Sequence, residues 1–268
     1  MIYLIPEAGG AAGIGAQSIA QGLGLTTVRV DSDPSVSDLC VPRGSEFAHL
    51  IEDFARGKDV VVLPTAERTA PVYAALARRG IVAGWFSEEA YMVSRDKLLM
   101  SGFPWAQPAS VSTNGPLFRK PRSGSGAVGC LPVSSREDVF CEESVYFDIL
   151  NEPYCVVDIV GQQAWSRRVL KQKGGSDIDM IFESKPELEE IALSVASDLK
   201  AHVLNVQFMY TDDSRPLVID IAPRFSGASS CLMHAGVNPL RALLYGEYQK
   251  LTPCRVTMTP KWISTEAR

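Results

Sequence analysis

The stretch that most constrains this chain is residues 205–227, which read NVQFMYTDDSRPLVIDIAPRFSG. Two apolar runs, at 203–210 and 216–221, flank a short segment rich in Asp, Ser and Thr. Apolar runs of strand length on either side of such a segment predict a β-hairpin. We therefore expect a hairpin followed by a polar elbow, and we expect the rest of the fold to be organised around it.

Polar side chains occupy matching places on the two expected strands. Gln207 lies on the first strand and Asp220 on the second, and residues opposite each other in a hairpin are about 5 Å apart. Arg224 and Gly227 follow in the loop after the second strand. Two oxygen donors beside an arginine suit a hard cation that carries phosphate. The alternative is a core hairpin whose Asp220 caps a turn and whose Arg224 meets solvent, because short oxygen-ligand patterns also arise by chance.

The composition is that of an ordinary globular protein. Of 268 residues, 46% are hydrophobic and 21% are charged, and the net charge of -5 leaves no basic excess for nucleic acid. No apolar run approaches the roughly 20 residues of a membrane span, and no basic segment typical of a secretion signal is visible at the start. The six cysteines form no C-x-x-C pair, which argues for reduced thiols and against zinc. We expect a cytoplasmic protein without nucleic-acid or membrane partners.

Residues 1–90 alternate between strand and helix patterns. The expected strands are 2–5, 26–30 and 60–63, and the expected helices run to about residue 23, over 46–56 and over 66–79. Strands that alternate with helices in this way predict a parallel, doubly wound sheet.

The glycine-rich turn at residues 9–15 resembles the dinucleotide fingerprint of short-chain dehydrogenases, and Asp31 stands where a ribose-binding acid would. That activity also needs a Tyr-x-x-x-Lys pair. No tyrosine here is followed by lysine at that spacing; Tyr91, for example, is followed by Arg95. A tight strand-to-helix turn is therefore favoured, and a dehydrogenase is a distant alternative.

A loop rich in glycine and serine follows the strand expected at 117–120. Its small residues are Ser123, Gly124, Ser125, Gly126 and Gly129. Such a loop leaves its backbone N–H groups free to fold over phosphate oxygens, and Lys120 at its base adds positive charge. It is not a Walker A loop, a dinucleotide turn or a kinase loop, because the residues that complete each of these are missing. A surface hairpin without function is the alternative.

The segments 146–150 and 155–160 are apolar and aromatic, and a Pro-containing turn is expected between them. Residues of this kind between two lobes could enclose an adenine ring. Ordinary core packing is the alternative, and it is favoured when these segments are considered alone.

Taken together, four motifs occur in one order: Asp96-Lys97, Lys120 with its glycine loop, Asp148-Ile149-Leu150, and the 205–227 stretch. That order resembles the ATP-grasp superfamily over essentially the whole chain. The nearest likeness is to the large chain of carbamoyl-phosphate synthetase and to small carboxylate–amine ligases. The resemblance implies a fold of α/β and α+β parts. A Rossmann-like pre-ATP-grasp domain (1–92) would precede a lid subdomain with the glycine loop (93–150) and a C-terminal subdomain with the metal site (151–268).

The resemblance also implies a role for each motif. The ATP-binding residues would be Lys97, Lys120, Ser123, Gly124, Ser125, Gly126, Gly129, Asp148, Ile149 and Leu150. Gln207 and Asp220 would bind Mg²⁺, Lys120 and Arg224 would act in catalysis, and Arg168 and Gly227 would face the substrate. The family's reaction forms an acyl phosphate from a carboxylate and ATP, which an amine then attacks. By the family's habit the protein would be a homodimer acting on small molecules.

The elbow departs from the family's usual Glu-x-Asn-Pro-Arg pattern. Asp220 replaces the glutamate and Ala222 replaces the asparagine, while Gln207 is neutral. Three outcomes are open. Another acid (Asp177, Asp179, Asp212 or Asp213) supplies the missing metal ligand, or one metal ion is held weakly, or catalysis is impaired. The alternatives to a ligase are therefore an ATP-grasp kinase and a nucleotide-binding module without catalysis. The sequence does not identify the carboxylate or the amine.

Overall fold

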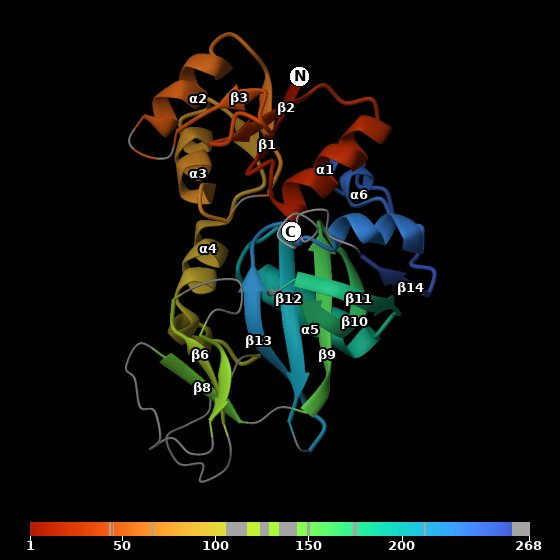
Figure 1. Cartoon of the computed structure of the whole chain (residues 1–268). Coiled ribbons are helices and arrows are strands. Elements are labelled where there is room, and N and C mark those ends of the chain that lie inside the picture. The colour runs from red at the N-terminus through yellow and green to blue at the C-terminus, as the bar shows by residue number, and fades with distance from the viewer. Residues whose placement is uncertain are drawn as a thin grey trace, which may run out of the picture.

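The computed structural model describes residues 1–42, 44, 46–65, 67–105, 117–123, 129–133, 144–148, 151–173, 176–211 and 213–258. The predicted site residues Gly124, Ser125, Gly126, Ile149 and Leu150 lie outside this part of the chain. Three sheets make up the described fold (Figure 1), and each of the three predicted segments contains one of them. The boundaries of those segments stay a prediction.

The first sheet has five parallel strands in the order β3-β2-β1-β4-β5. Its strands are β1 (Ile2–Pro6), β2 (Thr27–Asp31), β3 (Leu39–Cys40), β4 (Val60–Val62) and β5 (Ala83–Gly84). The connecting helices are α1 (Ala11–Gly22), α2 (Phe47–Ala55) and α3 (Ala70–Arg78). The predicted parallel order is confirmed. Helix α3 begins at Ala70 rather than at residue 66, because Pro71 is tolerated only in the first turn of a helix.

Helices α2 and α3 pack on this sheet through a core of its own. Ile51 of α2 and Tyr73 and Leu76 of α3 lie in one buried apolar cluster with Val30 and Val62 of the strands. The cluster fixes the carboxyl ends of β1 and β2 relative to the starts of α2 and α3.

Helix α4 (Glu88–Arg95) and the 3-10 helix η1 (Lys97–Gly102) lead from the first sheet toward the second. The 3-10 helix η1 ends at Gly102. The second sheet is antiparallel, with β6 (Leu117–Pro121) between β7 (Leu131–Val133) and β8 (Ser144–Asp148). The backbone N–H of Lys97 donates to the carbonyl of Arg122 at 3.0 Å, so η1 begins beside the end of β6.

The third sheet has six antiparallel strands in the order β13-β12-β9-β10-β11-β14. Its strands are β9 (Asn151–Val160), β10 (Gln163–Lys173), β11 (Ser176–Phe182), β12 (Val203–Tyr210), β13 (Pro216–Ala222) and β14 (Cys254–Thr257). Helix α5 (Pro186–Asp198) packs on one face, where Val157, Val206 and Phe208 meet Leu188 and Ala192 of the helix.

The prediction of a Pro-containing turn before residue 155 is wrong, because β9 runs without a break from Asn151 through Pro153. The register between β9 and β12 shifts between Phe208 and Tyr210, opposite this part of β9. A proline lacks the N–H that a regular ladder needs, so it is accommodated at an irregularity of this kind.

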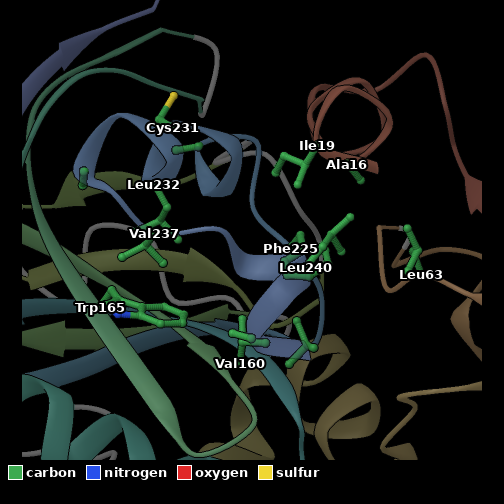
Figure 2. Packing of buried hydrophobic residues seen from close by; sticks show 14 of the residues in the cluster. Ala16, Ile19, Leu63, Val160, Trp165, Phe225, Cys231, Leu232, Val237 and Leu240 are labelled. Atoms are coloured by element: carbon green, nitrogen blue, oxygen red, sulfur yellow. The ribbon is translucent and has the colours of Figure 1, made fainter. Parts of the chain in front are cut away.

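A third apolar core joins the first and third sheets, as Figure 2 shows. Ala16 and Ile19 of α1 lie in the same buried cluster as Trp165 of β10, Leu232 of η3 (Ser229–Ala235) and Leu240 of α6 (Pro239–Tyr245). The backbone N–H of Phe225 also donates to the carbonyl of Pro64 at 2.7 Å. The N-terminal part of the chain is therefore packed against the C-terminal part mainly through α1, η3 and α6.

The cysteines in the described part of the chain are all free thiols. Among the same residues, no helix combines the length and the apolar character needed to cross a membrane.

Candidate functional site

The predicted hairpin is formed by β12 and β13, and its register places Gln207 directly opposite Asp220. The next pair is Phe208 with Val218, so β13 carries one extra residue, Ile219. Such a bulge bends a strand and re-aims the side chains beside it. The sequence prediction that the amide and the carboxylate face each other across the ladder is confirmed by this register.

Lys120 of β6 reaches across to this hairpin from the second sheet. Its Nζ donates to Asp220 Oδ2 at 2.9 Å and to the carbonyl of Ile219 at 2.9 Å. Lys120 is only 4% exposed, while the side chain of Asp220 is 24% exposed. A buried ammonium must be paired and hydrogen-bonded, and Asp220 does both while keeping access to solvent.

Lys97 at the start of η1 faces the same carboxylate, with its Nζ 3.9 Å from Asp220 Oδ1. It too is 4% exposed. Two ammonium groups therefore lie within 4.0 Å of one carboxylate, beside the oxygen donors of the hairpin. That arrangement attracts an anion such as phosphate.

A bidentate ion pair holds Lys97 in place. The guanidinium of Arg122 donates to both oxygens of Asp96, at 2.7 and 2.6 Å. These hydrogen bonds hold the pKa of the Asp96 carboxyl below its usual range. Asp96 also accepts from the backbone N–H of Leu98 at 3.1 Å and so caps η1. The pair thus fixes the first turn of η1, and with it Lys97, to the strand that carries Lys120.

The described ends of the glycine loop flank these lysines. Ser123 is exposed, and Gly129 has a positive φ of 77° that favours glycine. A Cβ on Gly129 would also come within 3.0 Å of the ring of Pro121. The phosphate-binding role predicted for this loop stays a prediction.

A small apolar cluster joins the second and third sheets. Val145 of β8 and Ile219 of β13 are buried in it, and Tyr154 of β9 packs against them. Burial raises the pKa of the Tyr154 hydroxyl far above its ordinary value, so the ring is a neutral, mainly apolar surface. Asp148 ends β8, the strand that carries Val145, and its predicted place beside an adenine stays a prediction.

The elbow after β13 carries Arg224, which turns toward the first sheet. Its Nε lies 3.5 Å from Glu67 Oε2, and Glu67 Oε1 lies 3.7 Å from Arg95 Nη1. The Glu67 side chain is mostly buried, at 12% exposed. Glu67 belongs to the loop between β4 and α3, so the sequence offered no local signal that it meets Arg224.

Gly227 lies where the elbow meets α1. A Cβ at this position would be 3.0 Å from the Cβ of Ala11, so a larger residue would push the elbow away from the helix. This contact gives Gly227 a packing role, and its predicted contact with substrate stays a prediction.

The structure does not bring Arg168 to the hairpin residues. Arg167, Val156, Gln207 and Asp220 form one row across four neighbouring strands, and successive side chains of a strand point to opposite faces. Arg168 therefore lies on the face that α5 covers, where its Nε is 3.3 Å from Glu183 Oε1. Arg167, which sequence reasoning did not single out, lies on the face that carries Gln207 and Asp220. The substrate contact predicted for Arg168 stays a prediction.

Arg167 is the centre of a buried polar network. Its guanidinium donates to Asp158, to Asp177 Oδ2 at 3.0 Å and to Ser226 Oγ at 3.3 Å. Asp158 in turn accepts from Asn205 Nδ2 at 3.0 Å. The network ties β9, β10, β11 and β12 to the loop after Arg224, so it holds that loop against the sheet.

A divalent cation at the hairpin would find the carboxylate of Asp220 and the amide oxygen of Gln207. Mg²⁺ is commonly held by one or two carboxylates together with phosphate oxygens and water. The side chains therefore fit one ion carried mainly by a polyphosphate. Within the part of the chain that the structure describes, no cluster of three or more His, Cys, Asp or Glu could hold a metal by itself.

The acids considered as compensating ligands are paired elsewhere. Asp177 bonds Arg167, Asp179 bonds Arg255, and Asp213 bonds Arg215. Asp212 lies outside the described residues. None of the three described acids, Asp177, Asp179 and Asp213, is therefore found to supply the metal ligand that Ala222 lacks.

Residues 141–264 match the family described as "ATP-grasp in the biosynthetic pathway with Ter operon". No curated protein matches the chain. Among solved structures, N5-carboxyaminoimidazole synthetase from Staphylococcus aureus complexed with ADP is 14% identical, with a TM-score of 0.72 over 94% of this chain and 79% of that one. An L-amino acid ligase from Bacillus licheniformis is 17% identical, with a TM-score of 0.67 over 91% of this chain and 72% of that one. A structure described as that of an ATP-grasp superfamily protein from Archaeoglobus fulgidus is 16% identical, with a TM-score of 0.67 over 95% and 91%.

The likeness to these structures shows that the chain has the ATP-grasp fold over nearly its whole length. The second half of the chain also matches an ATP-grasp family in sequence. The resemblance to the ATP-grasp superfamily, and the fold class that it implied, are thereby confirmed.

Proposed function

We propose that this chain is an ATP-dependent ligase that joins a carboxylate to an amine through an acyl phosphate and releases ADP and phosphate. The observation that carries the proposal is the convergence of Lys97 and Lys120 on Asp220, directly opposite Gln207. An ATP-grasp fold with two buried ammonium groups beside a hairpin of oxygen donors is suited to a nucleoside triphosphate.

In this proposal the chain contributes positioning and charge rather than covalent chemistry. The carboxylate attacks the terminal phosphorus of ATP, ADP leaves, and the amine then attacks the acyl carbon, losing a proton as phosphate departs. Phosphoryl transfer of this kind is catalysed mainly by orientation and by cancelling the charge that develops on oxygen. Lys97 and Lys120 would hold the phosphates, with the loop 123–129 closing over them.

Arg224 would neutralise the phosphoryl group as it is transferred. Its guanidinium faces Glu67 at 3.5 Å, a distance at which a closer anion can compete for it. A phosphoryl group would then replace Glu67 in part as the anion that pairs with Arg224.

Mg²⁺ would be held by Asp220 and Gln207 together with the phosphates. When bound, it would shield the negative charge of the phosphates during transfer. Asp220 would then exchange part of its contact with Lys120 for the metal, and the freed ammonium would face a phosphate oxygen.

The choice of a carboxylate–amine ligase is supported by two of the similar structures. The Bacillus licheniformis protein is an L-amino acid ligase, and the Staphylococcus aureus protein is a synthetase whose structure contains ADP. The substrates would be small molecules, and a homodimer and a cytoplasmic location belong to the same proposal.

The hairpin gives a specific reason to keep a second candidate, a nucleotide-binding module without catalysis. It offers one carboxylate, Asp220, and Ala222 cannot ligate metal. A kinase that stops at the acyl phosphate, or phosphorylates another acceptor, differs from the ligase only in its second step.

Turnover separates these candidates. ADP release is measured with Mg²⁺ and ATP against a panel of carboxylates, each with and without amines, and acyl phosphate is trapped with hydroxylamine. A ligase gives ADP release that depends on both substrates, a kinase releases ADP without the amine, and a binding module releases none. Loss of turnover is expected for Lys120→Met and not for Lys200→Met, whose side chain is 85% exposed on the surface.

A further inference from the structure

Asn205 lies directly opposite the position where the hairpin lacks the usual asparagine. The register pairs Asn205 of β12 with Ala222 of β13, and the next pair on the same face is Gln207 with Asp220. The pairing is regular over this stretch, because the bulge begins beyond Gln207. An amide therefore stands across the ladder from Ala222, on the face that carries the proposed metal ligands.

Asn205 is close enough to Asp220 for both to bind one ion. The two residues are diagonal neighbours in the ladder, and the Cβ atoms of such neighbours are about 7–8 Å apart or somewhat closer. Oxygens that bind one Mg²⁺ ion each lie about 2.1 Å from it, so they can be up to about 4 Å from each other. Two side chains that each extend from their Cβ toward the ion can cover the remaining distance.

The neighbouring strand on the other side fixes the orientation of the amide. Asn205 Nδ2 donates to Asp158 Oδ1 at 3.0 Å, and Asp158 lies directly opposite Asn205 on β9. Asp158 is paired with Arg167, so it is a carboxylate that only accepts, and Asn205 must present its NH₂ group to it. Because β12 lies between β9 and β13, the amide oxygen Oδ1 is turned toward β13 and Ala222.

This amide oxygen is free to bind a ligand. No described residue donates a hydrogen bond to Asn205 Oδ1, and it is not one of the described polar atoms that are closed to solvent and lack a partner. The residue as a whole is 4% exposed, so most of the amide is buried while Oδ1 keeps contact with solvent. A nearly buried oxygen without a partner is costly, and an amide oxygen suits a hard cation.

The small side chain of Ala222 leaves this oxygen unobstructed. Alanine has no atom beyond Cβ, so nothing from position 222 competes for the space in front of Asn205 Oδ1. An asparagine at 222 would place its own amide there. One amide on either strand could therefore serve the same ion, and in this chain the amide is on β12.

We propose that Asn205 is the metal ligand that replaces the asparagine missing at position 222. Asp220, Gln207 and Asn205 then hold one Mg²⁺ ion together with the phosphates of the nucleotide. The inference deepens the proposed function and rests on its nucleotide site.

The test measures how much Mg²⁺ strengthens the binding of ADP, by calorimetric titration with and without the ion. The hydroxyl of Asn205→Thr can still donate to Asp158, as Ser226 and Ser229 do, but a methyl group takes the place of Oδ1. The gain from Mg²⁺ should fall by about ten-fold or more, because losing even a group that only orients a metal ligand costs about 10–100-fold in metal affinity. ADP binding without metal should be unchanged.

Three further variants separate a metal ligand from a structural residue. Asn205→Asp keeps an oxygen toward the ion but loses the donor to Asp158, so it should keep the gain or increase it. Ser229→Ala removes a different hydrogen bond to the same Asp158 oxygen and should keep the full gain. Combining Asn205→Thr with Ala222→Asn moves the amide to the other strand and should restore the gain.

The inference is overturned if Asn205→Thr keeps the full gain from Mg²⁺. It is also overturned if Asn205→Asp or Ser229→Ala loses the gain, because the effect would then follow the buried network around Asp158 rather than the oxygen. A wild-type protein that does not bind ADP would instead count against the proposed function, so the two failures are distinguishable.

Discussion

Lys120 and Asp220 lie on different sheets, 100 residues apart in the chain, and their side chains are joined by a hydrogen bond of 2.9 Å. The bond brings the base of the glycine loop to the hairpin that carries Gln207. Asp220 therefore neutralises a buried ammonium. In the proposed complex it would share that role with a metal ion and a phosphate.

Asp220→Asn tests this exchange. The variant keeps the shape of the side chain but removes the charge that faces Lys97 and Lys120. We expect the free energy of unfolding to fall by about 1–3 kcal/mol, because a charge-assisted hydrogen bond is lost. ADP binding without metal should strengthen, while the gain from Mg²⁺ should shrink. Calorimetric titration of ADP with and without Mg²⁺ measures both; an unchanged gain from Mg²⁺ would exclude Asp220 as a ligand.

Arg167 and Arg168 are adjacent in sequence but face opposite sides of the sheet. Arg167→Met leaves Asp158 and Asp177 buried without their cation, so we expect a loss of about 3–5 kcal/mol in the free energy of unfolding. Arg168→Met removes an ion pair whose arginine side chain is 38% exposed, and a loss below about 1 kcal/mol is expected. Denaturant titration compares them, and equal losses would refute the assignment of the two faces.

Two glycines of α1 test the packing between the N-terminal and C-terminal sheets. A Cβ on Gly15 would lie 2.7 Å from the Cβ of Ser230 in η3, whereas a Cβ on Gly22 would meet nothing within 4 Å. Gly15→Ala should cost about 1–3 kcal/mol by overpacking. Gly22→Ala should be neutral or stabilising by up to about 1 kcal/mol because alanine favours the helix. Thermal unfolding of both variants measures these changes. An unchanged stability of Gly15→Ala would contradict the close packing of α1 on η3.

The Asp96–Arg122 pair predicts a specific response to acid. Arg122 lowers the pKa of Asp96 in the folded protein below its ordinary value of 3.8. The pair therefore contributes its full stability above that value and loses it as the pH falls through the lowered pKa. Asp96→Asn should be less stable than the wild type at neutral pH and should lose less stability on further acidification. Unfolding at a series of pH values tests this, with Asp53→Asn as the surface control; parallel curves for wild type and Asp96→Asn would contradict it.

Sequence reasoning succeeded where a function depends on neighbouring residues. The hairpin of β12 and β13 is formed by two apolar runs and a turn, so the pairing of Gln207 with Asp220 followed from local spacing. The parallel order of the first sheet likewise followed from the alternation of strand and helix patterns.

The sequence alone does not show which way a residue points within a long strand, because that depends on the register of the strand. Pro153 suggested a turn, but it is accommodated within β9, and the register of that strand puts Arg167 rather than Arg168 in the row with Asp220. Charge alone does not distinguish two adjacent arginines. The alternation of apolar residues along the strand was the available signal for which arginine lies on which face.

Contacts between distant loops were also beyond the sequence. The approach of Glu67 to Arg224 depends on how the first sheet packs against the third. The hydrogen bond from Asn205 to Asp158 likewise depends on which strand lies beside β12. Neither follows from local periodicity.

The central claim is that Lys97 and Lys120, drawn together at Asp220, form a site for nucleotide phosphates. The most direct test is the change in melting temperature on adding Mg²⁺ and ADP to the wild type, Lys97→Met and Lys200→Met. The wild type and Lys200→Met should be stabilised, by about 2.7 kcal/mol at a ligand concentration of 100 Kd, and Lys97→Met should lose this stabilisation. A wild type that does not respond to nucleotide, or a Lys97→Met variant that responds fully, would contradict the account.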